Sequence, residues 1–181
     1  MTRRVLLVAA TELELCGHDG LACGIGPVEA AAATARHLRG AKPDAVLHVG
    51  VAGGRRLIPG SLVLGTEAVY VDLAAEIPVV DRVEADRDLL SALQRLFPDA
   101  VSLPIATSAA VSGADATHDL RVEGMEGFGV LRACALGGVP AVEVRAVSND
   151  LGEGDRERWR IHRGLEVLGE TLPSMLETLS Q

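Results

Sequence analysis

Short apolar runs alternate with alanine- and leucine-rich stretches along the chain, and this alternation restricts the fold more than any other feature. Runs rich in β-branched residues predict buried strands at residues 5–10, 21–24, 45–51, 62–71, 101–107 and 141–147. Helical periodicity predicts helices at residues 28–38, 86–97, 126–136 and 155–168, with a break at Pro173. Strands that are apolar throughout need helices on both faces of their sheet. The sequence therefore predicts an α/β protein with three layers, α/β/α, around a central mostly parallel or mixed sheet.

The length of the chain limits the number of domains. With 181 residues it can bury a good core but is too short for two ordinary domains, so we expect a single domain over residues 1–181. Aromatic residues make up only 2% of the chain, so the core must consist of alanine, valine and leucine. Such residues suit buried strands covered by alanine-rich helices.

Charge and cysteine usage argue against several kinds of partner. The net charge is −8 without a run of basic residues, so we expect no nucleic-acid partner. The apolar N-terminal run ends at Thr11 and Glu12, too early for a signal peptide or a membrane-spanning helix. Cys16, Cys23 and Cys134 are odd in number and lack CxxC spacing, which favours a reducing cytoplasm and gives no reason to expect a metal site.

The segment from Val122 to Gly152 reads VEGMEGFGVLRACALGGVPAVEVRAVSNDLG. It resembles the site-forming core of the nucleoside phosphorylase and nucleosidase superfamily, in which a Met-Glu pair opens a helix and a later strand brings an acidic or amide residue to a purine. The resemblance extends through VLLVAATELE, GIGPVEAAAA and HVGVAGG. The Asn after Ser148 and the run DRERWRI are most similar to futalosine hydrolases. A phosphorylase/hydrolase-like fold, a purine nucleoside as small-molecule partner and a homo-oligomer whose neighbour helps to close the pocket are implied.

Met125 and Glu126 match the Met-Glu pair of this superfamily. The resemblance implies that Glu126 accepts hydrogen bonds from the ribose hydroxyls, and its charge would favour the oxocarbenium-like sugar that forms as the N-ribosidic bond breaks. Met125 would pack against the sugar. The alternative is that Glu126 is simply an acid in the first turn of a helix, where the helix dipole favours it.

Asn149 matches the residue that contacts the purine. In adenine-cleaving relatives this residue is an Asp that helps to protonate the purine N7. An amide offers both a donor and an acceptor, so Asn149 suits a 6-oxopurine such as the hypoxanthine of futalosine. Two alternatives remain open: Asn149 is an ordinary turn residue, or a shift of one position gives its place to Asp150.

Glu14 follows the first predicted strand and aligns with the family carboxylate that activates the attacking water. Glu12 is the fallback. Acidic residues at the end of a strand are often only solvated, but open α/β sheets bind their ligands at the carboxyl ends of the strands.

Two further segments are expected to contact the substrate. Val51, Ala52 and Gly53 belong to GVAGG, which resembles the glycine loop whose backbone N–H groups face the nucleophile and the ribose. Ala116 and Thr117 belong to a segment that lies along the purine in relatives. Relatives often have an aromatic residue there, so stacking must come from elsewhere, from Phe128 or a partner subunit.

Other conspicuous residues have structural interpretations. Gly24-Ile25-Gly26 lacks the third glycine of a dinucleotide fingerprint, because Glu29 stands in its place, so no cofactor is expected. His48 is interpreted as a core histidine. Trp159 is interpreted as a core anchor within the last helix. A neighbouring arginine would suit the benzoate of futalosine.

Hydrolysis is favoured over phosphorolysis, since Glu12 and Glu14 would repel phosphate. Arg55-Arg56 after the glycine loop is the opposing feature. The expected reaction is the hydrolysis of futalosine to hypoxanthine and dehypoxanthine futalosine in menaquinone biosynthesis. A methylthioadenosine/S-adenosylhomocysteine nucleosidase and a purine nucleoside phosphorylase are the alternatives. Because residues 15–23 and the connection before Val122 are short for the family, a non-catalytic nucleoside-binding protein also stays open.

Overall fold

The elements that the apolar pattern predicts follow one another in the expected order, and two short strands, Arg82–Glu84 and Val122–Gly124, were not predicted. The computed structural model describes residues 2–73, 76–110 and 119–181. Its strands are β1 Val5–Ala9, β2 Leu21–Ala22, β3 Ala45–Gly54, β4 Leu62–Tyr70, β5 Arg82–Glu84, β6 Val101–Thr107, β7 Val122–Gly124 and β8 Ala141–Asp150. Its helices are α1 Pro27–Gly40, α2 Arg87–Leu96, α3 Gly127–Gly137 and α4 Ile161–Leu179, with a short 3-10 helix, η1, at Arg156–Arg158.

The described strands form one mixed sheet with the order β2-β1-β3-β7-β6-β4-β5. β8 lies off this path and pairs in parallel with β3 and antiparallel with β4. Because β3 also pairs with β7, β7 with β6 and β6 with β4, these strands and β8 close into a ring. The mixed sheet is confirmed, and its partial closure is a feature that the sequence pattern did not indicate.

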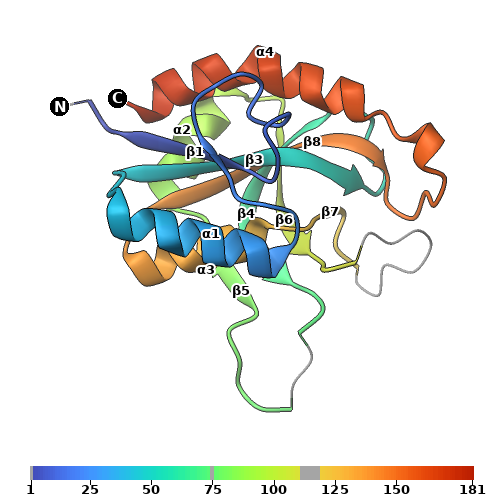
Figure 1. Cartoon of the computed structure of the whole chain (residues 1–181). Helices are drawn as coiled ribbons and strands as arrows, with labels where there is room; N and C mark the ends of the chain where they lie inside the picture. The colour runs from blue at the N-terminus through green and yellow to red at the C-terminus, as the bar shows by residue number, and fades with distance from the viewer. Residues whose placement is uncertain (1, 74–75, 111–118) are drawn as a thin grey trace.

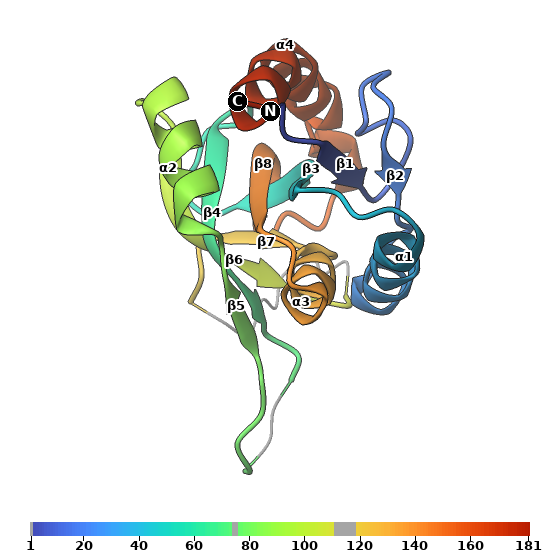
Figure 2. The same ribbon diagram turned by 90° about the vertical axis from the view of Figure 1, so that its left-hand side faces the viewer.

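Helices cover both faces of the sheet, as expected (Figure 1). Alternate residues of each strand point to opposite faces. Leu7 and Leu47 therefore join the cluster under α2 and α4, whereas Val8 and Val46 join the cluster under α1 and α3. Figure 2 shows α4 and the pair α1 and α3 on opposite sides of the strands. This arrangement confirms the three layers.

The C-terminal helix differs from the prediction. Residues 155–160 form η1 and an extended link, and α4 runs from Ile161 through Pro173 to Leu179. A proline inside a helix removes one hydrogen bond. Burial outweighs this loss, because Leu168 and Leu172 before the proline and Met175 after it lie in the same core. The expected break at Pro173 was therefore wrong.

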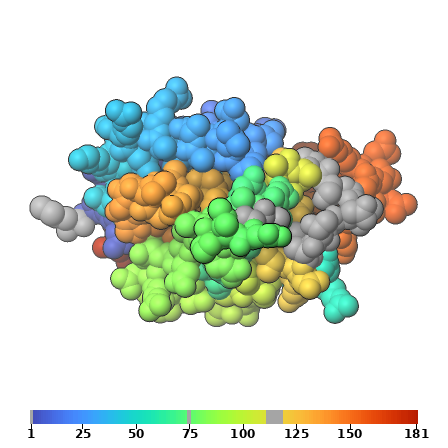
Figure 3. Space-filling view, turned by 90° about the horizontal axis from the view of Figure 1, so that it is seen from below, coloured from blue at the N-terminus to red at the C-terminus, as the bar shows by residue number. Residues whose placement is uncertain are grey.

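The connection between β4 and β5 projects from the body of the molecule (Figure 1). Its described part carries exposed apolar side chains, among them Ile77, Val79 and Val80. Figure 3 views the molecule from below, so this segment, in green, points toward the viewer in front of α2 and α3. None of the helices in the described ranges is long and apolar enough to span a membrane.

Candidate active site

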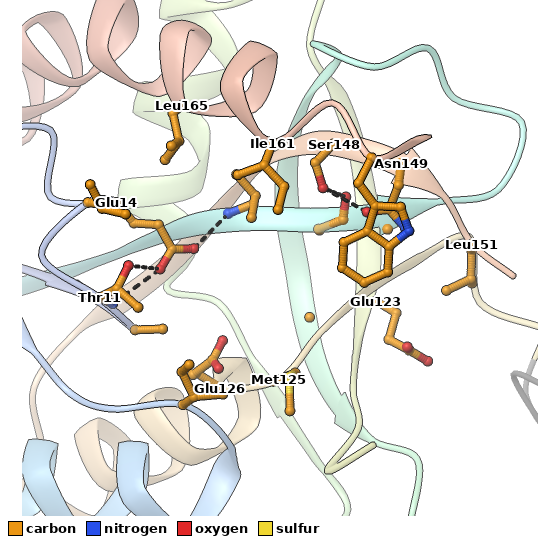
Figure 4. Close-up of a pocket in the computed structure, with 18 of the residues that line it drawn as sticks. Thr11, Glu14, Glu123, Met125, Glu126, Ser148, Asn149, Leu151, Ile161 and Leu165 are labelled. Carbon is orange, nitrogen blue, oxygen red and sulfur yellow. Dashed lines mark hydrogen bonds between the residues drawn. The ribbon is translucent and has the colours of Figure 1, made fainter. Parts of the chain in front are cut away.

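A pocket of about 300 Å³ opens at the carboxyl ends of β1, β3 and β8. Parallel strands meet there, and open α/β sheets place their ligands at this edge. The segments after β1, around Met125 and before α4 complete its wall (Figure 4). The lining side chains include Thr11, Leu13, Glu14, Ile25, Val51, Glu123, Met125, Glu126, Ser148, Asn149, Leu151, Trp159, Ile161 and Leu165.

Glu14 lies at one end of the pocket and its carboxylate is fixed from both sides. The Val51 N–H donates to Oε1 at 3.0 Å. The Thr11 N–H and hydroxyl donate to Oε2 at 3.2 and 2.9 Å. Glu14 is buried, whereas its neighbour Glu12 is exposed and does not line the pocket. The geometry thus favours Glu14 over Glu12 for a role in the site.

Glu126 is the N-cap residue of α3, not its first turn, and its side chain faces the pocket beside Met125 (Figure 4). The Gly26 N–H, which precedes α1, donates to Oε1 at 3.1 Å. The guanidinium of Arg145 lies 3.4 Å from Oε2. The side chain does not cap the helix that it begins. The carboxylate is held by residues outside α3, so the helix dipole, which favours an acid at this position, does not by itself account for its contacts.

Asn149 lies near the end of β8 and lines the pocket. Its Oδ1 accepts a hydrogen bond from the Ser148 hydroxyl at 2.7 Å, and its Nδ2 donates to the Asp150 carbonyl at 3.1 Å. Asp150 itself is exposed and does not line the pocket. Of the two registers that the sequence left open, only the one with Asn149 brings a side chain to the pocket.

The GVAGG segment is the end of β3 rather than a loop. Val51, Ala52 and Gly53 line the pocket. Gly53 and Gly54 pair with β7 and β8, so their backbone belongs to the sheet ladder. The loop expected there was wrong because strands on both sides extend the pairing. Ala116 and Thr117 lie outside the described residues.

The aromatic residues are placed differently from the prediction. Phe128 stacks on Tyr70 with ring centroids 5.4 Å apart and does not line the pocket. Trp159 follows η1 and lines the pocket, with its Nε1–H donating to the Glu153 carbonyl at 2.8 Å. Arg156 lies 5.7 Å from the Trp159 ring. Trp159 is therefore a half-buried wall of the pocket and not the core anchor inferred from the sequence.

A buried polar network lies behind the pocket, and it was not identified from the sequence as a functional feature. It consists of Glu143 and Arg145 on β8 and His48 on β3, all fully or almost fully buried. Arg145 Nε donates to Glu143 Oε1 at 2.7 Å, and its Nη2 lies 2.7 Å from His48 Nε2. The available signal was two charged residues, Glu143 and Arg145, in an otherwise apolar strand.

Burial sets the ionisation of this network. It lowers the pKa of His48 well below its usual value, and the charge of Arg145 lowers it further. Burial would lower the pKa of Arg145 as well, but Glu143, Glu126 and Glu14 raise it above its ordinary value. The guanidinium is thus charged and His48 is neutral. A neutral His48 can donate from Nδ1 to the Val8 carbonyl, 3.0 Å away, and accept from Arg145 at Nε2.

The low pKa of His48 predicts a loss of stability in mild acid. Below pH 6.5, which is about the pKa of a histidine in an unfolded chain, His48 binds a proton in the unfolded protein but not in the folded one. Between pH 6.5 and 5.5 this should lower the free energy of unfolding by about 1 kcal/mol. Urea unfolding at both pH values measures it. The loss should shrink by this amount in His48→Asn and stay unchanged in the exposed control His162→Asn; an equal loss in both variants would contradict the assignment.

Among the described residues, no group of three His, Cys, Asp or Glu side chains is arranged so that it could hold a metal ion. The pocket offers instead two fixed carboxylates, Glu14 and Glu126, and the amide of Asn149. Such a set can accept hydrogen bonds from hydroxyl groups, polarise a water molecule and bind the edge of a heterocycle.

Comparison with known proteins gives the family. Residues 20–179 match the model of the phosphorylase superfamily, and the chain belongs to this superfamily. It is similar to a futalosine hydrolase of Streptomyces coelicolor, with 36% identity over 90% of this chain and 80% of the relative.

Two nucleosidases are also similar. A 5'-methylthioadenosine/S-adenosylhomocysteine nucleosidase of Actinobacillus succinogenes is 31% identical over 75% of this chain and 68% of the relative. The crystal structure of such a nucleosidase from Colwellia psychrerythraea 34H, in complex with adenine, superposes with a TM-score of 0.86 over 99% of this chain and 96% of the other. Its sequence identity is 21%, so this similarity concerns the fold.

Proposed function

We propose that the protein is a nucleosidase that hydrolyses the N-ribosidic bond of futalosine, releasing hypoxanthine and dehypoxanthine futalosine for menaquinone biosynthesis. The observation that carries the proposal is the charge of the pocket. Glu14, Glu123 and Glu126 line it, but no Lys or Arg side chain does among the described residues. The 36% identity to a futalosine hydrolase supports the choice of substrate.

Four of the residues that line the pocket then have a role in the reaction. Glu14 accepts a proton from a water molecule, whose oxygen attacks the anomeric carbon of the ribose as the bond to the purine breaks. Glu126 accepts hydrogen bonds from the ribose hydroxyls and stabilises the positive charge on the sugar. Asn149 binds the purine edge, donating to O6 and accepting from the protonated N7 of hypoxanthine. Met125 packs against the sugar.

The remaining wall suits an apolar substrate tail. Leu13, Ile25, Leu151, Ile161 and Leu165 line the pocket beyond these polar groups. Several of them are exposed to solvent in the free protein, Leu13 and Ile25 by more than half. An aromatic group attached to the ribose would cover such side chains and remove their apolar surface from water.

A product analysis with and without phosphate tests the reaction class. A phosphorylase must bind a dianion, and the two carboxylates oppose this. Arg55 and Arg56 follow β3 but do not line the pocket. We expect hypoxanthine from futalosine at a rate that phosphate does not change, with no sugar phosphate formed. Detection of a ribose 1-phosphate product would overturn the proposal and point to Arg55 and Arg56.

The alternatives give different products in the same experiment. A methylthioadenosine/S-adenosylhomocysteine nucleosidase, favoured by the 31% identity to such an enzyme, would release adenine from methylthioadenosine faster than hypoxanthine from futalosine. A purine nucleoside phosphorylase would need phosphate. A nucleoside-binding protein would release no base but would still bind. Trp159, the only tryptophan, lines the pocket, so its fluorescence would report such binding.

We also propose that the single domain works as a homo-oligomer in the cytoplasm. The support is the projecting connection between β4 and β5, where Ile77, Val79 and Val80 are exposed. Contiguous exposed apolar side chains of this kind are typical of protein–protein contacts. The cysteines agree with a reducing compartment, because Cys16, Cys23 and Cys134 are all free thiols.

A further inference from the structure

Glu143 does not line the pocket, yet it is tied to the pocket through Arg145. The two side chains are about 1% exposed and form an ion pair of 2.7 Å between Glu143 Oε1 and Arg145 Nε. The far end of the guanidinium contacts three groups from two elements: His48 and the Val51 carbonyl, both on β3, and Glu126 at the start of α3. Glu143 therefore holds one edge of a group whose other edge reaches the candidate active site.

Glycines leave the space that this pair occupies. A Cβ at Gly124 would lie 3.1 Å from Arg145 Cζ, and one at Gly50 would collide with Arg145 Nη1 and lie 2.9 Å from Glu14 Oε1. A Cβ at Gly127 would lie 2.6 Å from Glu143 Cδ. Side chains at these positions would displace the pair. The glycines of three segments thus leave the space that the guanidinium and its carboxylate partner fill.

Stability alone does not explain why such a pair is buried. Removing two charges from water costs about as much as their attraction returns, and apolar replacements of similar volume are often neutral or stabilising. Burial accordingly raises the pKa of Glu143, although Arg145 opposes this effect. No described group donates a hydrogen bond to Glu143 Oε2. The hydrogen bond of this carboxylate is the one that Oε1 accepts from Arg145 Nε.

The contact at Nε decides the orientation of the guanidinium plane. Arg145 Nη2 lies between His48 Nε2 at 2.7 Å and Glu126 Oε2 at 3.4 Å. A rotation of the plane would break both contacts. Glu126 Oε1 is held separately by the Gly26 N–H, so the Arg145 contact fixes the second oxygen of the same carboxylate. The orientation of Glu126 therefore depends on Glu143 through Arg145.

We propose that Glu143 is a positioning residue, which holds the Arg145 guanidinium in place beside Glu14. In this place the guanidinium orients the carboxylate of Glu126 toward the ribose. This inference rests on the proposed function, because the ribose that Glu126 faces belongs to the proposed substrate. It concerns catalysis and not substrate affinity, since Glu143 does not line the pocket. Loss of the contact should lower kcat while KM changes little.

Two substitutions of similar size separate positioning from packing. Glu143→Gln keeps an oxygen that can accept from Arg145 Nε, whereas Glu143→Met fills the same space without an acceptor. We expect Glu143→Met to lower kcat for futalosine roughly a hundredfold, as small displacements of catalytic groups do. Glu143→Gln should restore most of this loss. The matched control is Glu67 on β4, whose Oε1 lies 3.5 Å from Arg82 Nη1 and which does not line the pocket. The same substitutions at Glu67 should leave kcat unchanged.

A second measurement does not depend on turnover, and its first part needs only the wild-type protein. Among the residues that the structure describes, Arg145 is the one buried arginine, and its Nε–H donates a hydrogen bond to a buried carboxylate. In the NMR spectrum of the wild-type protein, one arginine Nε–H signal should exchange with deuterated solvent far more slowly than the others. Glu143→Met should lose this protection and Glu143→Gln should keep it.

The outcomes are distinguishable. A wild-type protein that cleaves no nucleoside refutes the proposed function, while the NMR experiment still tests the contact between Glu143 and Arg145. Equal kcat values for Glu143→Met and wild type, or equal losses in Glu143→Met and Glu143→Gln, would overturn the positioning role. So would rapid exchange of every arginine Nε–H signal in the wild type. Slow exchange together with a loss restored by Gln supports it.

Discussion

Glu126→Gln is expected to lose most of the turnover while the protein stays folded. The substitution keeps the shape of the side chain and its contact with the Gly26 N–H, but removes the negative charge that faces the sugar. Loss of one electrostatic contact to a charged transition state costs on the order of 3 kcal/mol, which is roughly a hundredfold or more in rate. Steady-state release of hypoxanthine from futalosine measures the effect, with circular dichroism as the check on folding.

Glu29 provides the control for this experiment. It lies in the first turn of α1, so it shares with Glu126 a position at the start of a helix, but it is exposed and does not line the pocket. Glu29→Gln should therefore keep the activity. If Glu126→Gln retains at least about a third of the wild-type rate, the charge of Glu126 does not stabilise the sugar and its assignment fails.

Much of the fold could be predicted because its local signals agree with the tertiary structure. Residues 101–107 form β6 as predicted, since an apolar run between two breaks has no competing pattern. Asp86 caps α2 with hydrogen bonds to the N–H groups of Asp88 and Leu89, as its position before an amphipathic run suggests. Pro27 begins α1, where its missing N–H costs nothing.

Errors arose where distant segments decide the local structure. The end of β3 extends past Val51, where the predicted strand ended, because β7 and β8 offer partners to Gly53 and Gly54, and no local pattern shows this. Closure of the sheet through β8 is likewise a property of pairing between remote strands. α4 continues through Pro173 because the core under it extends to both sides of the proline.

The same limit applies to the candidate site. Glu14, Glu126 and Asn149 were found from their motifs, and the structure brings all three to one pocket. The network around Arg145 depends on the register of β8 against β3, which places Arg145 opposite Gly50. The sequence could flag two charges in an apolar strand, but it could not show which residues they meet.

Asn149→Asp is expected to shift the substrate preference from 6-oxopurine nucleosides toward adenine nucleosides. The Asn149 Nδ2 can donate to the O6 of hypoxanthine, whereas an ionised Asp would face that oxygen with another acceptor. Such an unmatched contact costs about 1–3 kcal/mol, or up to roughly a hundredfold in selectivity. The amino group of adenine would meet a good acceptor instead. The measurement is the ratio of kcat/KM for futalosine or inosine to kcat/KM for methylthioadenosine.

Asp150→Asn is the matched control, because it makes the reverse exchange one residue further along β8. Asp150 is exposed and does not line the pocket, so this variant should leave the ratio unchanged. The Ser148 hydroxyl can donate to an Asp at position 149 as it does to Asn149 Oδ1, so the first variant keeps this contact and loses the one from Nδ2 to the Asp150 carbonyl. A wild-type preference for methylthioadenosine, an unchanged ratio in Asn149→Asp, or a shift caused by Asp150→Asn would each show that Asn149 does not select the base. The choice of futalosine would then rest on sequence similarity alone, without support from the hydrogen-bonding chemistry of the pocket.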